Sequence, residues 1–186
     1  MQHDMTHCRR LPFHAVLLAG LLATAAGPAA AADCLADDAG RLEMIVNGSL
    51  EARIAWSGGS LRCDGMPRPD GSGLRLMFGN EAEALLVVIG VTGAARGETA
   101  EDLPANLTLV REGEGEFYST LGDDICQVTL TENRPEAGRE AGIFRVSGTG
   151  ECARPIPAVA REGEVRVRPF SFTGRVLWPA EAENVP

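Results

Sequence analysis

Four cysteines, Cys34, Cys63, Cys126 and Cys152, are the residues beyond the N-terminus whose chemistry is most sharply constrained. None of them has the CxxC spacing of a zinc site, so no metal centre is expected. In an oxidising compartment an even number of cysteines predicts disulfides, and four cysteines allow three connectivities. We expect sequence neighbours to pair, Cys34 with Cys63 and Cys126 with Cys152.

The N-terminus indicates that the chain enters such a compartment. Arg9 and Arg10 precede an apolar stretch, residues 11–26, which is followed by small residues at 30–32. This order is typical of a secretory signal peptide, so we expect residues 1–32 to be removed. The apolar stretch is too short to serve as a good permanent membrane anchor.

Removal of the signal peptide would also remove every histidine, since His3, His7 and His14 lie within it. The chain contains no lysine. A Ser-His-Asp or Cys-His nucleophile, a histidine-ligated metal, a Schiff base and a P-loop lysine are therefore excluded. Paired carboxylates, as in glycoside hydrolysis, are the remaining catalytic chemistry. We expect no cofactor and no enzymatic activity.

Charge narrows the range of partners. Without Asp4, Arg9 and Arg10, the mature chain has 15 arginines against 25 carboxylates, a net charge of −10. Nucleic acids and anionic membrane surfaces are therefore not expected partners. The alanine- and arginine-rich, lysine-free composition indicates a high-GC bacterium, and hence the periplasm or the medium. Asp33 stands where a lipoprotein signal has a small residue, so a lipid on Cys34 is not expected.

Carboxylates gather near two glycine-rich turns, at Glu112, Glu114, Asp123 and Asp124. Their spacing matches no EF-hand loop, so solvated loop charge is the first interpretation. A weak calcium site is the alternative.

Arginines gather near the C-terminus, at Arg154, Arg161, Arg166 and Arg168. Arg166 and Arg168 would project from the same face of a strand, where they could bind a carboxylate or phosphate. The solvated face of an antiparallel sheet is the favoured interpretation, and an anion site is the alternative.

Aromatic residues are few, and most fall at positions expected to face a core. Phe117 and Tyr118 are neighbours, so they must lie on opposite faces of their strand. We expect Tyr118 to point outward and to be a candidate for surface recognition.

The elements that would position these residues are short alternating runs separated by Gly, Pro, Asn and Asp. They predict about ten strands and no helix of normal length, hence an all-β domain, a single antiparallel sandwich or barrel-like structure. We expect this domain to span residues 33–179, followed by a flexible acidic tail, residues 180–186.

Two hairpins can be predicted in detail. Residues 84–91 are apolar on both faces, which predicts an interior strand covered on both sides. Around Asn47-Gly48, matching apolar faces requires an odd-length loop that sets Met44 opposite Leu50 or Ala52.

Strand register supports the second disulfide. The run that begins at Cys126 and the run from Phe144 to Cys152 alternate cleanly, and antiparallel pairing would bring the two cysteines together. In the last run, residues 164–178, apolar residues occupy odd-numbered positions before Pro169 and even-numbered positions after it. This change of parity predicts a bulge or a bent strand at Pro169.

The leading functional hypothesis is a non-catalytic exported domain that binds a protein or a small apolar or anionic ligand. The loops at residues 64–72 and 92–104 are the expected recognition elements, because rigid β-scaffolds often bind through loops. A carboxylate-based hydrolase acting on envelope glycan and a structural envelope component are the alternatives.

Overall fold

The computed structural model describes residues 34–122, 125–139 and 141–179. The expected signal peptide, Asp33 and the tail lie outside these residues. The described residues form twelve strands and two single-turn 3₁₀ helices, Gly58–Ser60 and Glu81–Glu83, and neither helix could cross a membrane. The strands are β1 (Arg41–Gly48), β2 (Ala52–Ser57), β3 (Arg62–Pro67), β4 (Gly73–Asn80), β5 (Leu85–Thr92), β6 (Ala100–Arg111), β7 (Glu116–Ser119), β8 (Cys126–Pro135), β9 (Ile143–Cys152), β10 (Ile156–Pro157), β11 (Glu164–Val167) and β12 (Phe170–Leu177). The all-β prediction is confirmed, with twelve strands rather than about ten.

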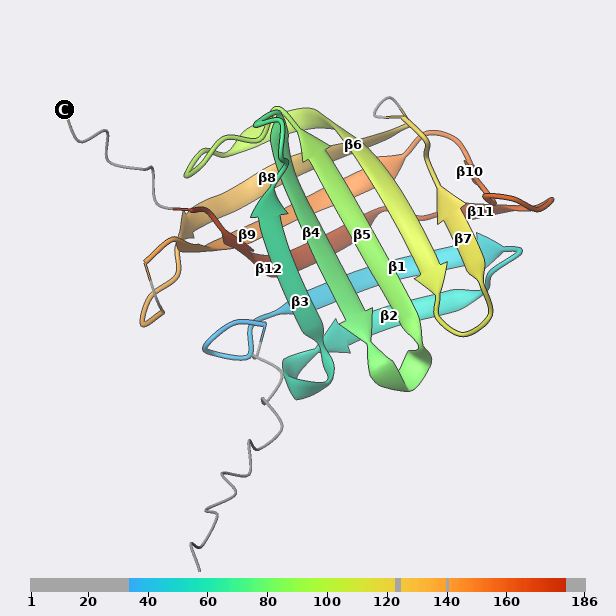
Figure 1. Cartoon of the computed structure of the whole chain (residues 1–186), viewed down its shortest axis with the longest axis horizontal. Coiled ribbons are helices and arrows are strands. Elements are labelled where there is room, and N and C mark those ends of the chain that lie inside the picture. Colours follow the sequence, from blue (N-terminus) through green and yellow to red (C-terminus); the bar gives the residue numbers. More distant parts are fainter. Residues whose placement is uncertain (1–33, 123–124, 140, 180–186) are drawn as a thin grey trace, which may run out of the picture. The chain divides into compact units, whose positions relative to one another are not determined.

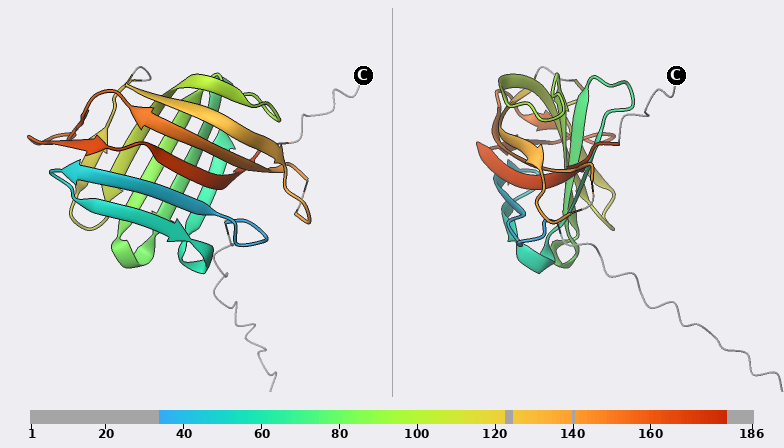
Figure 2. Two further views of the ribbon diagram at one scale, coloured as in Figure 1. Left: turned by 180° about the vertical axis from the view of Figure 1, so that it is seen from behind. Right: turned by 90° about the vertical axis from the view of Figure 1, so that its left-hand side faces the viewer.

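All strand pairs are antiparallel and belong to one hydrogen-bonded sheet, in the order β10-β11-β1-β12-β9-β8-β6-β5-β4-β3, with β2 on β1 and β7 on β6. The sheet folds over on itself (Figures 1 and 2). Strands β3 to β7 form one layer, here called the front sheet. Strands β1, β2, β8, β9 and β12 form the other, the back sheet, and cross the front strands steeply. The layers join where β6 pairs with both β5 and β8.

The core lies between the two layers and is built from the inward half of each alternating strand. Leu76, Phe78 and Ile89 of the front sheet and Phe172 of the back sheet are all almost completely buried. The rings of Phe78 and Phe172 lie 6.2 Å apart and join the layers. Gly148 leaves room for Phe172, because a side-chain carbon at position 148 would lie 2.9 Å from the ring.

Both expected disulfides are present, Cys34–Cys63 and Cys126–Cys152. Cys126 lies directly opposite Cys152 in the β8–β9 ladder, as the alternation predicts. Cys34–Cys63 joins the segment before β1 to strand β3. Because the Cys34 sulfur is in a disulfide, it is not available to carry a thioether-linked lipid.

The β1–β2 hairpin has the expected odd loop but a different partner for Met44. Val46 pairs with Ala52 around a five-residue loop, so Met44 lies opposite Ile54. The expected partners of Met44 are therefore wrong, because the loop is longer than the three residues of the simplest odd turn. Gly48 allows the longer loop by adopting a φ of 120°, which glycine tolerates best.

Pro169 marks a bulge, as the change of parity predicts. Strand β1 pairs with both halves of the last run, with Val46 opposite Val167 and Glu43 opposite Ser171. One extra residue therefore lies on the β11–β12 side, and the inward face is restored beyond Pro169.

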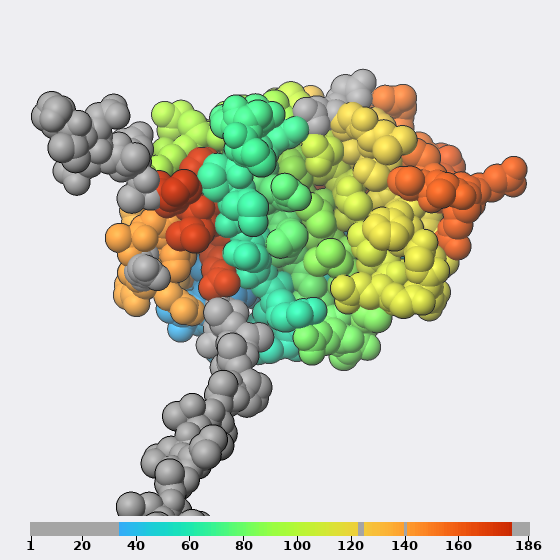
Figure 3. Space-filling view, viewed as in Figure 1, coloured from blue at the N-terminus to red at the C-terminus, as the bar shows by residue number. Residues whose placement is uncertain are grey.

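Strand β5 differs from the prediction of an interior strand covered on both sides. Val87 and Ile89 face the core, whereas Leu86 and Val88 face outward and are only half-buried. In the part of the chain that the structure describes, no second layer covers this outer side of the front sheet (Figures 2 and 3). The prediction is therefore wrong, and the outward residues of β5 belong to an apolar surface.

Candidate functional site

The outer face of the front sheet is the strongest candidate for a functional surface, and Figure 3 views it directly. Met66 is 41% exposed and Phe117 is 45% exposed at its two sides. Between them, the apolar outward side chains of the three middle strands are half-buried. These side chains are Met77 of β4, Leu86 and Val88 of β5, and Val110 of β6.

The strand register makes these side chains neighbours. Met77 lies opposite Val88, while Leu86 lies opposite Val110, which in turn lies opposite Phe117. Side chains at directly opposed positions of antiparallel strands lie within contact range. Leu86 and Val88 lie two residues apart on the same face of β5 and join these pairs, so the four middle residues and Phe117 form one patch, here called the apolar stripe.

A hollow of about 470 Å³ lies beside the apolar stripe. We call it the Gly90 hollow, and its lining residues are Arg68, Pro69, Asp70, Arg75, Val88, Gly90, Asn106 and Thr108. In the ladder, Arg75 of β4 lies opposite Gly90, and Gly90 lies opposite Asn106 of β6. A side-chain carbon at position 90 would collide with Asn106 Oδ1, so the glycine lets this carboxamide lie across β5.

The charges in the Gly90 hollow are unevenly paired. Arg68 donates from Nη1 to Thr92 Oγ1 at 3.0 Å, and its Nε lies 3.9 Å from Asp70. The Asp70 carboxylate accepts hydrogen bonds from the Ser72 hydroxyl and backbone N–H, which lower the pKa of Asp70. Arg75 is exposed, and its guanidinium makes no hydrogen bond or ion pair with any described residue.

A second hollow, of about 360 Å³, lies on the same face around Gly79. Met77 and Leu86 of the apolar stripe line it, together with Arg62, Asp64 and Arg175. Arg175 Nε lies 3.8 Å from Asp64, so this hollow contains its own charge pair. The apolar stripe is thus flanked by two hollows that both contain arginine.

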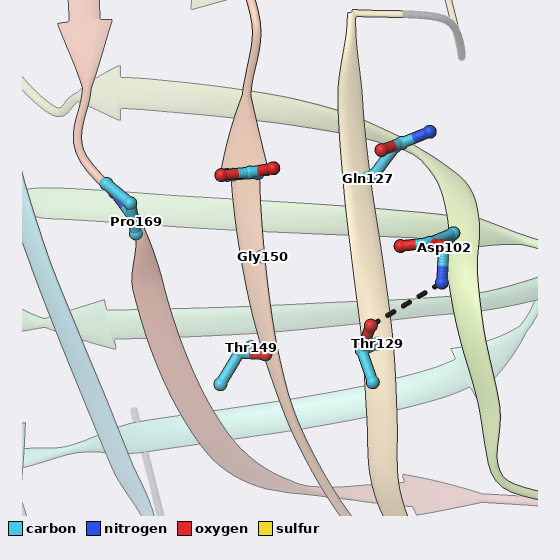
Figure 4. Close-up of a pocket in the computed structure, with 7 residues that line it drawn as sticks. Asp102, Gln127, Thr129, Thr149, Gly150 and Pro169 are labelled. Carbon is cyan, nitrogen blue, oxygen red and sulfur yellow. Dashed lines mark hydrogen bonds between the residues drawn. The ribbon is translucent and has the colours of Figure 1, made fainter.

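The back sheet has a more polar groove on its outer face (Figure 4). One part, of about 180 Å³, is lined by Asp102, Gln127, Thr129, Thr149, Gly150, Glu151 and Pro169. The Asp102 backbone N–H donates to Thr129 Oγ1 at 3.4 Å. Past Thr149 and Pro169 the groove continues into a hollow of about 470 Å³ between β1, β2 and β12. Polar side chains dominate its narrower part, where Asp102 and Glu151 are the only carboxylates among the described lining residues.

Carboxylate catalysis requires one acid whose pKa is raised toward neutrality. Among the described carboxyl groups, the shifts found in Asp37, Asp70 and Glu136 are all downward. The first cause for Asp37 and Glu136 is a hydrogen bond from the Arg145 guanidinium. None of the three lines the polar groove, so these shifts belong to structural contacts and give a hydrolase no support.

No family model, curated protein or solved structure matches this chain. Evidence for function therefore comes from its own surface.

The prediction that Tyr118 points outward is wrong. Its side chain is fully buried, and its hydroxyl accepts a hydrogen bond from Arg161 Nη2 at 2.6 Å. A backbone bridge to Ala158 holds this part of β7 against the segment after β10. The outward aromatic residue is Phe117, its neighbour.

The C-terminal arginines do not line any of the hollows described above. The Arg161 guanidinium donates a hydrogen bond to the Tyr118 hydroxyl and forms an ion pair with Glu116, whose Oε1 lies 2.6 Å from Nη2. Arg166 and Arg168 are exposed beside the inward-facing valines of β11, and Arg154 is exposed after β9. Anion binding by these arginines remains a prediction.

The calcium candidates are only partly described. Glu112 and Glu114 are exposed in the β6–β7 turn, and Glu114 lies 3.8 Å from Arg111 Nη1. Asp123 and Asp124 lie outside the described residues. Within the described ranges, no three His, Cys, Asp or Glu side chains are grouped as a metal site would require.

Sequence reasoning assigned recognition to loops and missed the apolar stripe. Its apolar residues, Met77, Leu86, Val88 and Val110, stand at outward positions of three neighbouring strands, but polar residues, Arg75, Asn106 and Thr108, share that face, so the sequence pattern alone did not mark it. In β5 the apolar residues on both faces predict a covering layer rather than a binding surface.

Proposed function

We propose that this protein is an exported, non-catalytic binding domain that recognises a protein partner through the outer face of its front sheet. The observation that carries the proposal is the apolar stripe, which no described segment covers. An apolar patch that a chain does not cover itself is typical of an interaction site. The two disulfides fit a compartment outside the cytoplasm, and the signal-peptide pattern supports the periplasm or the medium.

The composition of this face favours a protein partner over a small ligand. Aromatic residues, methionine and arginine are enriched in protein interfaces, and this face has Phe117, Met66, Met77 and several arginines. A small apolar ligand is usually enclosed over most of its surface. The two hollows beside the apolar stripe are open to solvent, so they suit projecting side chains of a larger partner.

The experiment compares capture of partners by three forms of the mature protein. Tagged wild type, Val88→Arg and Thr149→Arg would each be exposed to native envelope extract and culture medium. Val88→Arg places a charge in the apolar stripe, while Thr149→Arg makes a matched change on an exposed strand position of the back sheet. We expect proteins captured by wild type to be retained by Thr149→Arg and lost by Val88→Arg.

Equal capture by Val88→Arg and wild type would contradict the proposal. Loss with Thr149→Arg alone would move the binding site to the polar groove of the back sheet. Light scattering of the purified protein provides a further check, because a dimer broken by Val88→Arg would make a second copy of the chain the occupant of this face.

A further inference from the structure

We propose that the Gly90 hollow is a carboxylate-binding subsite of this surface, in which Arg75 binds the carboxylate. The inference rests on the proposed function, because the anions that a protein partner presents are Asp and Glu side chains and its C-terminus. It adds a chemical requirement to that function, namely that the partner places a carboxylate beside the apolar stripe.

Arg75 lines the hollow and lies opposite residue 90, where a side chain would otherwise take up space. Arg75 and Asn106 lie on opposite sides of Gly90, which has no side chain to separate them. The Asn106 carboxamide extends over the glycine, so it lies on the Arg75 side of its own strand. A ligand in the hollow would thus meet a guanidinium on β4 and a carboxamide from β6.

The balance of charge favours an anion. The hollow contains two arginines and one carboxylate, Asp70. Asp70 is already bonded to Ser72 and lies near Arg68, whereas Arg75 has no partner among the described residues. The lining of the hollow therefore has one more positive charge than negative charge. The Arg75 guanidinium can bind a carboxylate through two parallel N–H donors.

The surroundings would strengthen such a contact once the partner is bound. Val88 belongs both to the hollow and to the apolar stripe. A partner that covers the stripe would therefore exclude water near Arg75. An ion pair gains strength as the local dielectric constant falls, provided that both charges are paired and hydrogen-bonded.

The simplest alternative is that Arg75 only keeps an apolar face soluble, since exposed charges on sheets commonly do so. The two interpretations differ in what Arg75 does to small carboxylates. A solubilising arginine would bind them no better than any other exposed arginine. Arg53 of β2 is a matched comparison, because it is exposed on a strand of the other layer and likewise has no partner among described residues.

The test uses the mature protein labelled with ¹⁵N and three tripeptide probes, so no natural partner is needed. Acetyl-Gly-Glu-Gly-amide offers only a side-chain carboxylate, acetyl-Gly-Gly-Gly offers only a C-terminal carboxylate, and acetyl-Gly-Gln-Gly-amide offers neither. We expect saturable shifts of the backbone amides of Arg75, Gly90 and Asn106 with at least one acidic probe and none with the neutral probe. The acidic probe that binds better identifies the source of the carboxylate.

Variants then assign the binding to Arg75. Arg75→Gln should weaken the acidic probe at least about fivefold, and Arg75→Lys should give an intermediate loss because it keeps the charge but not the paired donors. Arg53→Gln should leave the affinity unchanged. The amide spectrum of each variant shows directly whether the fold is kept.

Three results would overturn the subsite. They are no saturable shift up to about 50 mM peptide, equal binding of the neutral probe, and equal affinity in Arg75→Gln and wild type. If Arg53→Gln weakened binding of the acidic probe as much as Arg75→Gln, the binding would reflect only the total charge of the protein, and the subsite would also be overturned. None of these results bears on Val88→Arg, so failure of the subsite and failure of the proposed surface are distinguishable.

Discussion

Arg145 joins two parts of the chain that are far apart in sequence. Its guanidinium donates to Glu136, at the start of the β8–β9 turn, at 2.8 Å, and to Asp37, in the segment before β1, at 2.7 Å. The Glu136 side chain is only 2% exposed, so its charge depends on this partner. Hydrogen bonds from Arg145 lower the pKa of both carboxyl groups, and those same bonds raise the pKa of Arg145.

Glu136→Gln should therefore destabilise the fold at neutral pH by about 1–3 kcal/mol, because it leaves the partly buried Arg145 with one charged partner fewer. A carboxyl group whose pKa is lowered on folding stabilises the protein above its unfolded pKa. That contribution disappears as the pH falls through the folded pKa. Urea unfolding should show the gap between wild type and variant shrinking from roughly pH 5 downward.

The control is Arg62→Gln, which breaks the exposed pair between Arg62 and Glu81, 3.0 Å apart. Exposed pairs contribute little, so its effect should stay within about 0.5 kcal/mol. Two results would contradict the structural role assigned to Arg145. One is a loss of unfolding free energy in Glu136→Gln that stays constant in acid, and the other is a loss no larger than that of Arg62→Gln.

Strand β7 shows how an element acquires its orientation from outside itself. Its two aromatic residues are adjacent, and either could face the core. The polar hydroxyl of Tyr118 favours an orientation toward solvent. A tyrosine can nevertheless be buried stably when its hydroxyl has a hydrogen-bond partner. Arg161 provides that partner and also lies 5.6 Å from the ring centroid. Arg161 lies 43 residues after Tyr118 in the sequence, so the sequence of β7 alone does not predict this contact.

Replacing the two aromatic residues separately should reveal this orientation. Tyr118→Ala removes a fully buried ring and should cost about 3–5 kcal/mol, while Phe117→Ala removes an exposed ring and should cost less than about 1 kcal/mol. The measurement is the denaturant concentration at the midpoint of unfolding, compared between wild type and each variant with the same dependence of the unfolding free energy on denaturant. The reverse ranking would mean that the strand has the opposite face inward.

At the scale of the whole molecule, two sheets cross over one core and leave each sheet with an outer face. The narrower part of the groove on the outer face of the back sheet is lined mostly by polar residues, whereas the outer face of the front sheet contains the apolar stripe. This difference is the basis for placing the proposed partner on the front sheet. One disulfide ties the segment before β1 to strand β3, and the other ties the neighbouring strands β8 and β9.

Export makes a prediction for the intact chain. Protein purified from the periplasm or medium of a bacterial host should lack residues 1–32 and should contain no reactive thiol when denatured without reductant, because all four remaining cysteines are paired. N-terminal sequencing and alkylation followed by mass measurement would check both points. Retention of the N-terminus, or alkylation of Cys34 or Cys63, would contradict the expected maturation.

Alternation along the chain was sufficient to predict much of the fold. The class, the alternating core positions, the Cys126–Cys152 register and the bulge at Pro169 all follow from which side chains share a face. Such patterns are local to a strand or a hairpin, and a change of one residue in register reverses every side chain. The same pattern could not find the candidate surface.

Tertiary structure decided which apolar faces are covered. The sequence of β5 is equally compatible with a second covering layer and with a binding surface, because alternation defines two faces without saying what lies over either. The burial of Tyr118 depends on Arg161, and the Gly90 hollow exists because three strands place Arg75, Gly90 and Asn106 in one row. Contacts between residues distant in sequence create these features, so no local pattern encodes them.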